Sequence, residues 1–132
     1  MNLSPRKLVR TFYESDLIHD DEIIKNYVHP DVNIHWNSSS GLFKMKYEDI
    51  IALFKGMRDA FEFSRCDISH VLADKEKVSI RYDFIVKPIE NNVEELMGHF
   101  MCIWELKDDK LHTGYMVSQS ADTSSKNLIT FI

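Results

Sequence analysis

Histidine and cysteine are the residue types in this sequence that could hold a metal ion or act as nucleophiles. The 132-residue chain has six histidines and two cysteines. No two histidines stand four residues apart on an expected helix, and no cysteine or carboxylate pattern of the zinc type lies near them. We therefore expect no metal site and no cofactor.

The histidines have simpler interpretations. We expect His112 to form a cross-strand ion pair with Glu105. His70 is the histidine that the alternation of its strand allows to point inward, together with Cys66. The others are expected at helix ends or on the outer face of a sheet: His19, His29, His35 and His99.

A nucleophilic role for Cys102 would require a neighbouring group that lowers the pKa of its thiol. Its expected neighbours are apolar or aromatic, and such surroundings raise a thiol pKa, which favours an inert, packed cysteine. Cys66 and Cys102 show no motif spacing, so the sequence predicts reduced thiols and a cytoplasmic protein.

Apolar periodicity predicts the elements that must position these residues. Ser4 and Pro5 start a first helix, because a hydroxyl can cap its free amides and proline suits its first turn. A second, short helix runs from Asp20 or Asp21 and is stopped by Pro30. The later elements are a strand at 32–36, a loop at 37–41, a third helix at about 46–60, and strands at about 63–73 and 78–87.

Residues 97–119 read as a long antiparallel hairpin that turns at Asp108 and Asp109. That turn makes one face of the hairpin apolar and aromatic, and we expect this face to line a pocket. The predicted facing pairs are Leu106–Leu111, Trp104–Thr113, Cys102–Tyr115 and Phe100–Val117.

The opposite face of the hairpin and its neighbouring strand predicts an association surface. An exposed apolar patch with a charged rim commonly marks association, so we expect a two-fold homodimer packed through this face. A competing interpretation is that residues 124–132 cover it within one subunit. The predicted band consists of Ile85, Met101, Ile103 and Met116.

Chain length and net charge indicate the number of domains and exclude some classes of partner. A chain of 132 residues predicts a single domain over residues 1–132. The net charge is −5 and no basic stripe is present, so nucleic acid and anionic membranes are not expected partners. No apolar run is long enough to span a bilayer.

The order of these elements resembles the nuclear transport factor 2-like superfamily, especially its SnoaL-like and ketosteroid-isomerase-like branch. The resemblance rests on "FYESDLIHDDEIIKNYVHPDVNIHW", on Gly41 leading into "YEDIIALFKGM", and on "GHFMCIWELKDDKLHTGYM". It implies an α+β fold in which a cone-shaped, curved antiparallel sheet wraps around three helices. The open end of such a cone holds a small, largely apolar ligand, and the superfamily usually forms homodimers.

The resemblance also allows the positions of the isomerase's catalytic groups to be compared with this sequence. That chemistry needs a carboxylate base and two acidic donors. It places Trp36 where that family keeps its base, Phe12 at the tyrosine donor and Cys102 near the acidic donor. None of these side chains can do the corresponding job. Tyr13 lies one residue along, but one residue on a helix rotates a side chain by about 100°. Isomerase activity by that mechanism is therefore not expected.

SnoaL-like cyclases are expected to carry an acidic residue late in the final strand. The corresponding position here is about Gln119, and Asp122 follows three residues later. Glutamine can orient a carbonyl group but cannot take a proton near neutral pH. An isomerase- or cyclase-type enzyme that uses Gln119 or Asp122 remains one alternative.

We therefore predict a protein that binds a small apolar or aromatic molecule. The other alternative is a non-catalytic homodimeric association module whose cone is filled by its own side chains. A cavity of ~300 Å³ or more that opens to solvent would separate the two. The predicted ligand-binding residues are Phe12, Trp36, Phe54, Tyr82, Phe100, Cys102, Trp104, Tyr115 and Gln119.

Overall fold

The structure, a computed structural model, describes residues 3–121 of the chain. Asp122 and the predicted docking segment 124–132 lie outside these described residues. The first helix, α1 (Pro5–Glu14), begins as predicted, because the Ser4 hydroxyl accepts a hydrogen bond from the backbone N–H of Lys7 at 3.2 Å. Its apolar side chains are buried against the sheet: Leu8, Val9, Phe12 and Tyr13.

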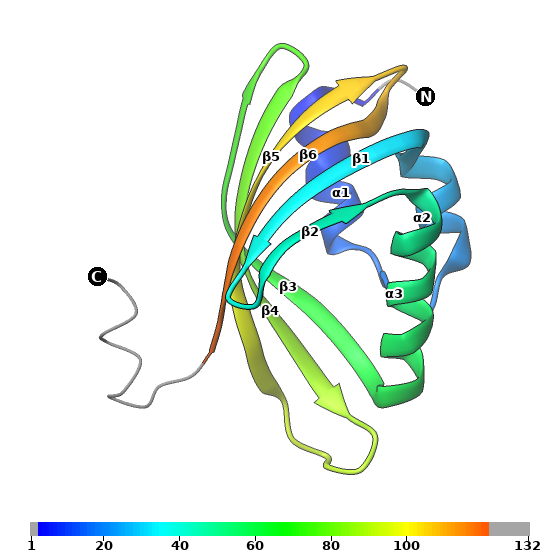
Figure 1. Ribbon diagram of the computed structural model, residues 1–132, viewed down its shortest axis with the longest axis vertical. Helices are drawn as coiled ribbons and strands as arrows, with labels where there is room; N and C mark the ends of the chain where they lie inside the picture. Colours follow the sequence, from blue (N-terminus) through cyan, green and yellow to red (C-terminus); the bar gives the residue numbers. More distant parts are fainter. Residues whose placement is uncertain (1–2, 122–132) are drawn as a thin grey trace.

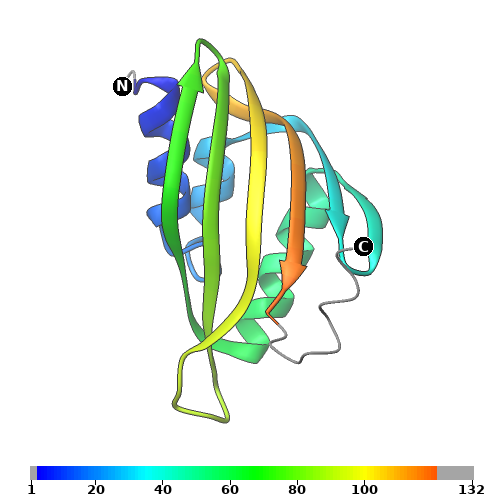
Figure 2. The same cartoon turned by 90° about the vertical axis from the view of Figure 1, so that its left-hand side faces the viewer.

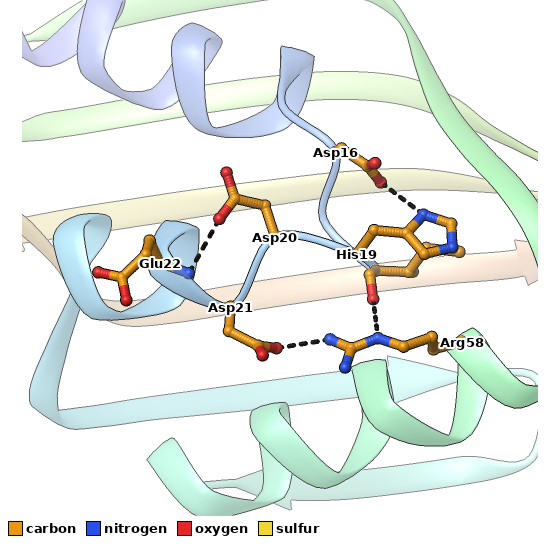
Figure 3. Close-up of polar contacts among 7 residues, drawn as sticks. Asp16, His19, Asp20, Asp21, Glu22 and Arg58 are labelled. Carbon is orange, nitrogen blue, oxygen red and sulfur yellow. Dashed lines mark hydrogen bonds and ion pairs between the residues drawn. The ribbon is translucent and has the colours of Figure 1, made fainter.

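Arg58 ties α3 (Tyr47–Ala60) to the connection that precedes α2 (Asp21–Tyr27), as Figure 3 shows. Its Nε donates a hydrogen bond to the carbonyl oxygen of Ile18 at 2.7 Å, and its guanidinium pairs with Asp21 at 2.5 Å. The Arg58 guanidinium lowers the pKa of the Asp21 carboxyl below its ordinary value. None of the helices described is long and apolar enough to cross a membrane.

Six strands form one curved sheet, with the helices on its concave side (Figure 1). Figure 2 looks onto the opposite, convex face, where the later strands lie in front of the helices. The predicted α+β cone with three helices is confirmed. The sheet order is β2-β1-β6-β5-β4-β3, and the strands are β1 (Val28–Ser38), β2 (Gly41–Met45), β3 (Phe61–Asp74), β4 (Lys77–Pro88), β5 (Glu95–Lys107) and β6 (Lys110–Ser120).

Two features of this sheet differ from the prediction. The expected loop at 37–41 is instead the tight turn of a hairpin, because β1 continues to Ser38 and β2 pairs with it. Gly41 makes this possible with a φ of 118°, a conformation that favours glycine. The sheet is also mixed rather than wholly antiparallel, since β1 pairs with β6 in parallel.

The hairpin of β5 and β6 turns at Asp108 and Asp109 as predicted, and both residues have positive φ, as a two-residue turn of this type requires. The predicted pair Leu106–Leu111 is confirmed. The register then shifts, because Glu105 pairs with Thr113 and leaves one additional residue in β6. A bulge of this kind changes which face every later side chain points to.

The other three predicted pairs are therefore wrong by one residue. Trp104 pairs with Gly114, Cys102 with Met116 and Phe100 with Ser118. A Cβ atom on Gly114 would lie 2.9–3.1 Å from the Trp104 ring, so the indole lies flat against a strand that has no side chain there. Tyr115 and Val117 consequently face the convex side, and Gly114, Met116 and Ser118 face the helices.

The same bulge overturns the expectation for two histidines. Thr113, not His112, stands opposite Glu105, so the predicted ion pair does not form. His112 instead packs edge-on against His29, with ring centroids 4.9 Å apart. His29 is buried in β1 rather than solvated at a helix end, and its Nε2 lies 3.2 Å from Asp108 Oδ2.

A second irregularity, in β3, decides the position of His70. Ile68 pairs with Tyr82 and His70 with Arg81, which leaves Ser69 as the additional residue. The next inward side chain is then the buried Val71, and His70 is exposed. The prediction that His70 points inward was wrong for this reason.

Candidate functional site

A cavity of about 270 Å³, here called the inner chamber, lies between the helices and the concave face of the sheet. Helices α1 and α3 and all six strands supply side chains to its lining, whereas α2 supplies none. Six of the nine predicted ligand-binding residues line the inner chamber: Phe12, Trp36, Phe54, Tyr82, Phe100 and Trp104.

The other three predicted residues lie elsewhere. Cys102 is buried behind the wall of the chamber and does not line it. Tyr115 points away on the convex face, where its ring stacks on His35 at 5.2 Å. Gln119 lines a second cavity that adjoins the inner chamber. The β6 bulge explains the error for Tyr115, because it reverses the faces of that strand.

Tyr13 lines the chamber although the sequence argument set it aside. Neighbouring residues on a helix differ by about 100° in direction, but an apolar stripe of that width can bury both. Its hydroxyl accepts a hydrogen bond from Trp104 Nε1 at 2.9 Å, and its ring lies 4.7 Å from that of Tyr82. Burial raises the pKa of both tyrosines well above the ordinary value, so both hydroxyls stay protonated. The width of the stripe in α1 was the signal that could have identified Tyr13.

Both cysteines have free thiols; Cys102 is buried and Cys66 is half-buried. Burial raises the pKa of Cys102 far above its ordinary value, and burial together with the Asp67 charge raises the pKa of Cys66 to about 12. A thiol that stays protonated is a poor nucleophile. The predicted packing of Cys102 is therefore confirmed, and the raised pKa of its thiol agrees with the expectation of an inert cysteine.

Among residues 3–121, the side chains that line the inner chamber include no acid or base suited to proton transfer near neutral pH. None of its described lining residues is Asp, Glu, His, Lys or Arg. General acid–base catalysis needs such a group within hydrogen-bonding reach of the reacting atom. Within residues 3–121 there is likewise no cluster of three or more His, Cys, Asp or Glu that could hold a metal ion.

A second cavity of about 570 Å³, here called the vestibule, adjoins the inner chamber. Its lining is much more polar and includes the turn between β1 and β2 and the end of β6. Trp36, Met45, Met97 and Phe100 line both cavities, so the two meet at these side chains. The polar residues of the vestibule are Ser38, Ser39, Ser40, Lys44, Asp49, Ser118, Gln119 and Ser120.

Trp36 stands at this junction. Its ring lies 5.7 Å from Phe43 and 6.3 Å from Phe100, measured between centroids. Its Nε1 donates a hydrogen bond to the Ser118 hydroxyl at 2.8 Å. The polar tip of this half-buried aromatic side chain therefore has a partner, and its apolar surface remains available to the cavities.

Comparison with solved structures finds the same fold in several proteins. IdmH, "a putative polyketide cyclase" from Streptomyces antibioticus, is 13% identical with a TM-score of 0.73, over 88% of this chain and 92% of that one. AclR, "a putative hydroxylase" from Streptomyces galilaeus, is 14% identical with a TM-score of 0.72, over 96% and 92%. An NTF2-like protein of unknown function from Burkholderia pseudomallei is 15% identical with a TM-score of 0.64, over 98% of both chains.

Identities this low show a shared fold and nothing about substrate. No curated protein matches the sequence significantly. The family model for the SnoaL-like domain matches residues 9–112, which include the later part of α1, all of α2 and α3, and strands β1 to β5. The chain therefore belongs to the SnoaL-like domain family and has the nuclear transport factor 2-like fold.

Proposed function

We propose that this protein binds a small aromatic or largely apolar molecule, with the rings of that molecule in the inner chamber. The observation that carries the proposal is a chamber walled by aromatic and aliphatic side chains without a charged group. Ligand sites of proteins are typically ~300–1,000 Å³, mostly apolar, with a few polar groups that fix orientation. The inner chamber, at about 270 Å³, is slightly smaller than this range, and the adjoining vestibule of about 570 Å³ adds to the space available to a ligand.

Binding is favoured over the two alternatives. An association module with a filled cone would be expected to lack a chamber of this size at its centre. A cyclase-type enzyme is the second candidate function, supported by the fold shared with IdmH and by the place of Gln119 beside the vestibule. Gln119 can orient a carbonyl group but cannot accept a proton near neutral pH, so we propose binding as the primary role.

A pair of neighbouring residues in β6 offers the test. Met116 lines the chamber, whereas Tyr115 faces the convex side. Wild-type protein titrated with 2-ethylnaphthalene should show saturable quenching of tryptophan fluorescence, since Trp36 and Trp104 both line the chamber. Met116→Trp should fill the chamber and weaken binding at least about ten-fold, and Tyr115→Ala should leave it unchanged.

A wild-type protein that binds no 2-ethylnaphthalene would contradict the proposal. Equal binding by wild type and a folded Met116→Trp variant would contradict it as well. In either case the inner chamber would not be the binding site for apolar molecules.

We also propose that the chain forms a homodimer through the convex face of the sheet. Four large side chains there are each about half exposed: Met101, Ile103, Tyr115 and Val117. Apolar groups in a continuous exposed patch commonly mark an association surface. Of the predicted band, Ile85 is half-buried on this face, but Met116 belongs to the inner chamber and Tyr115 and Val117 take its place.

A further inference from the structure

Ser118 lines the vestibule, beside side chains that line both cavities. It pairs with Phe100 across β5 and β6, and the Phe100 ring lines both cavities. Its hydroxyl accepts the 2.8 Å hydrogen bond from Trp36 Nε1. An indole N–H can only donate, so this bond fixes the hydroxyl oxygen of Ser118 as an acceptor.

The Ser118 hydroxyl can still donate a hydrogen bond. A serine hydroxyl has one proton and two acceptor lone pairs, and Trp36 occupies one lone pair. Within residues 3–121, Trp36 is the one hydrogen-bond partner of the Ser118 hydroxyl, so its proton has no protein acceptor there. Trp36 binds the oxygen of the Ser118 hydroxyl, so the hydroxyl proton remains available to a ligand or to water.

The other serines of the vestibule are placed differently. The Ser38 hydroxyl donates to the carbonyl oxygen of Gly41 at 3.0 Å and accepts from the N–H of Ser40 at 3.1 Å, so it serves the turn. The Ser39 hydroxyl accepts a hydrogen bond from the N–H of Ser120 at 3.3 Å, and Ser39 is exposed. Ser118 is the described serine that shares a hydrogen bond with a side chain lining both cavities.

We infer that Ser118 donates a hydrogen bond to an oxygen acceptor of the ligand, and that the ligand class is therefore an aromatic molecule with a ring-attached carbonyl group. This inference rests on the proposed binding function and adds its specificity. The ring system occupies the apolar chamber, and the carbonyl oxygen lies at the junction beside Ser118. A carbonyl at this position replaces water as the acceptor and leaves the rest of the ligand in apolar surroundings.

Two probes of nearly the same shape separate this inference from binding in general. 2-Acetylnaphthalene has the carbonyl oxygen and 2-ethylnaphthalene lacks it. Ser118→Ala should weaken 2-acetylnaphthalene about five-fold, the typical effect of one neutral hydrogen bond, and change 2-ethylnaphthalene by less than about two-fold. Ser118→Thr, which keeps a hydroxyl, should retain the preference for the ketone. Ser69→Ala should change neither affinity, because Ser69 is exposed on β3 and lines neither cavity.

The outcomes distinguish the role of Ser118 from the binding function itself. Equal weakening of both probes by Ser118→Ala would mean that Ser118 only supports Trp36, and it would overturn the inference. Unchanged binding of both probes to Ser118→Ala would also overturn it, while the binding function would stand. If wild type bound neither probe, the binding function itself would fail.

Discussion

The two faces of the β5–β6 hairpin differ less in residue type than in what covers them. On the concave face, Trp104 is buried and its N–H is bonded to Tyr13. On the convex face, Met101 and Tyr115 are about half exposed. Both faces are apolar, so composition does not tell a pocket wall from an association surface. Strand parity and the position of the helices do.

The polar groups of the two faces follow the same division. Inside, the N–H groups of Trp36 and Trp104 have protein partners at 2.8 and 2.9 Å. Outside, His99 pairs with Asp83 at 2.7 Å at a position open to solvent. A solvent-exposed contact of this kind contributes little to stability, whereas a buried hydrogen bond is costly to break. Substitutions on the two faces should therefore have unequal effects.

The largest difference should come from Trp104→Ala. Removing a buried tryptophan costs ~3–5 kcal/mol of unfolding free energy, and Tyr13 also loses its hydrogen-bond partner. Leu72→Ala removes a large side chain that is 66% exposed and should stay within ~0.5 kcal/mol of wild type. Denaturant unfolding of both variants measures the contrast. Similar losses in the two variants would remove the distinction between the faces.

Self-association should respond to the convex face alone. Met101→Glu buries an unpaired charge in the proposed interface and should weaken dimerisation by ~100-fold or more, which size-exclusion elution and sedimentation can detect. Its unfolding free energy at low protein concentration should change little, because Met101 is exposed within one chain. An elution volume identical to that of wild type would exclude this face as the interface.

Two glycines provide a smaller, matched comparison. A Cβ on Gly114 would meet the buried Trp104 ring at 2.9–3.1 Å, so Gly114→Ala should destabilise the protein by ~1–3 kcal/mol through overpacking. Gly56 lies in α3 with nothing within 4 Å of its Cβ position, so Gly56→Ala should stabilise by ~0.5–1 kcal/mol. Thermal unfolding tests the opposite signs. A neutral Gly114→Ala would mean that Trp104 moves away without cost.

The smallest expected effect is a pH dependence from the chamber wall. The pKa of Cys66 is raised to about 12 in the folded protein, so its thiol stays protonated there while the thiol of the unfolded chain ionises from about pH 9. The unfolded state then binds fewer protons, and folding stability falls as the pH rises from about 9 towards 12. Comparison of wild type with Cys66→Ala at pH 7 and pH 10 should show about 1 kcal/mol less pH-dependent loss in the variant. Equal losses in both proteins would place Cys66 in an ordinary, solvated environment.

The sequence alone was sufficient for the elements whose signals are local. Ser4 and Pro5 predicted the start of α1, and Asp108 and Asp109 predicted the turn of the closing hairpin. The chamber residues predicted correctly lie on the helices, on β1, or on β4 and β5. In these segments the apolar period continues without interruption up to the side chains that line the chamber. The resemblance to the SnoaL-like branch added the cone shape, which periodicity could not provide.

What only the tertiary structure decided lies beyond an irregularity or between distant segments. The additional residue in β6 reversed the faces of Tyr115 and Met116, and the one at Ser69 turned His70 outward. Pairing of β1 with β6 in parallel joined segments about 80 residues apart and brought Trp36 to Ser118. The bulge at His112 brings Gly114 opposite Trp104, where the indole ring fits only because glycine has no side chain. That fit depends on side chains of different strands, which local sequence patterns do not report.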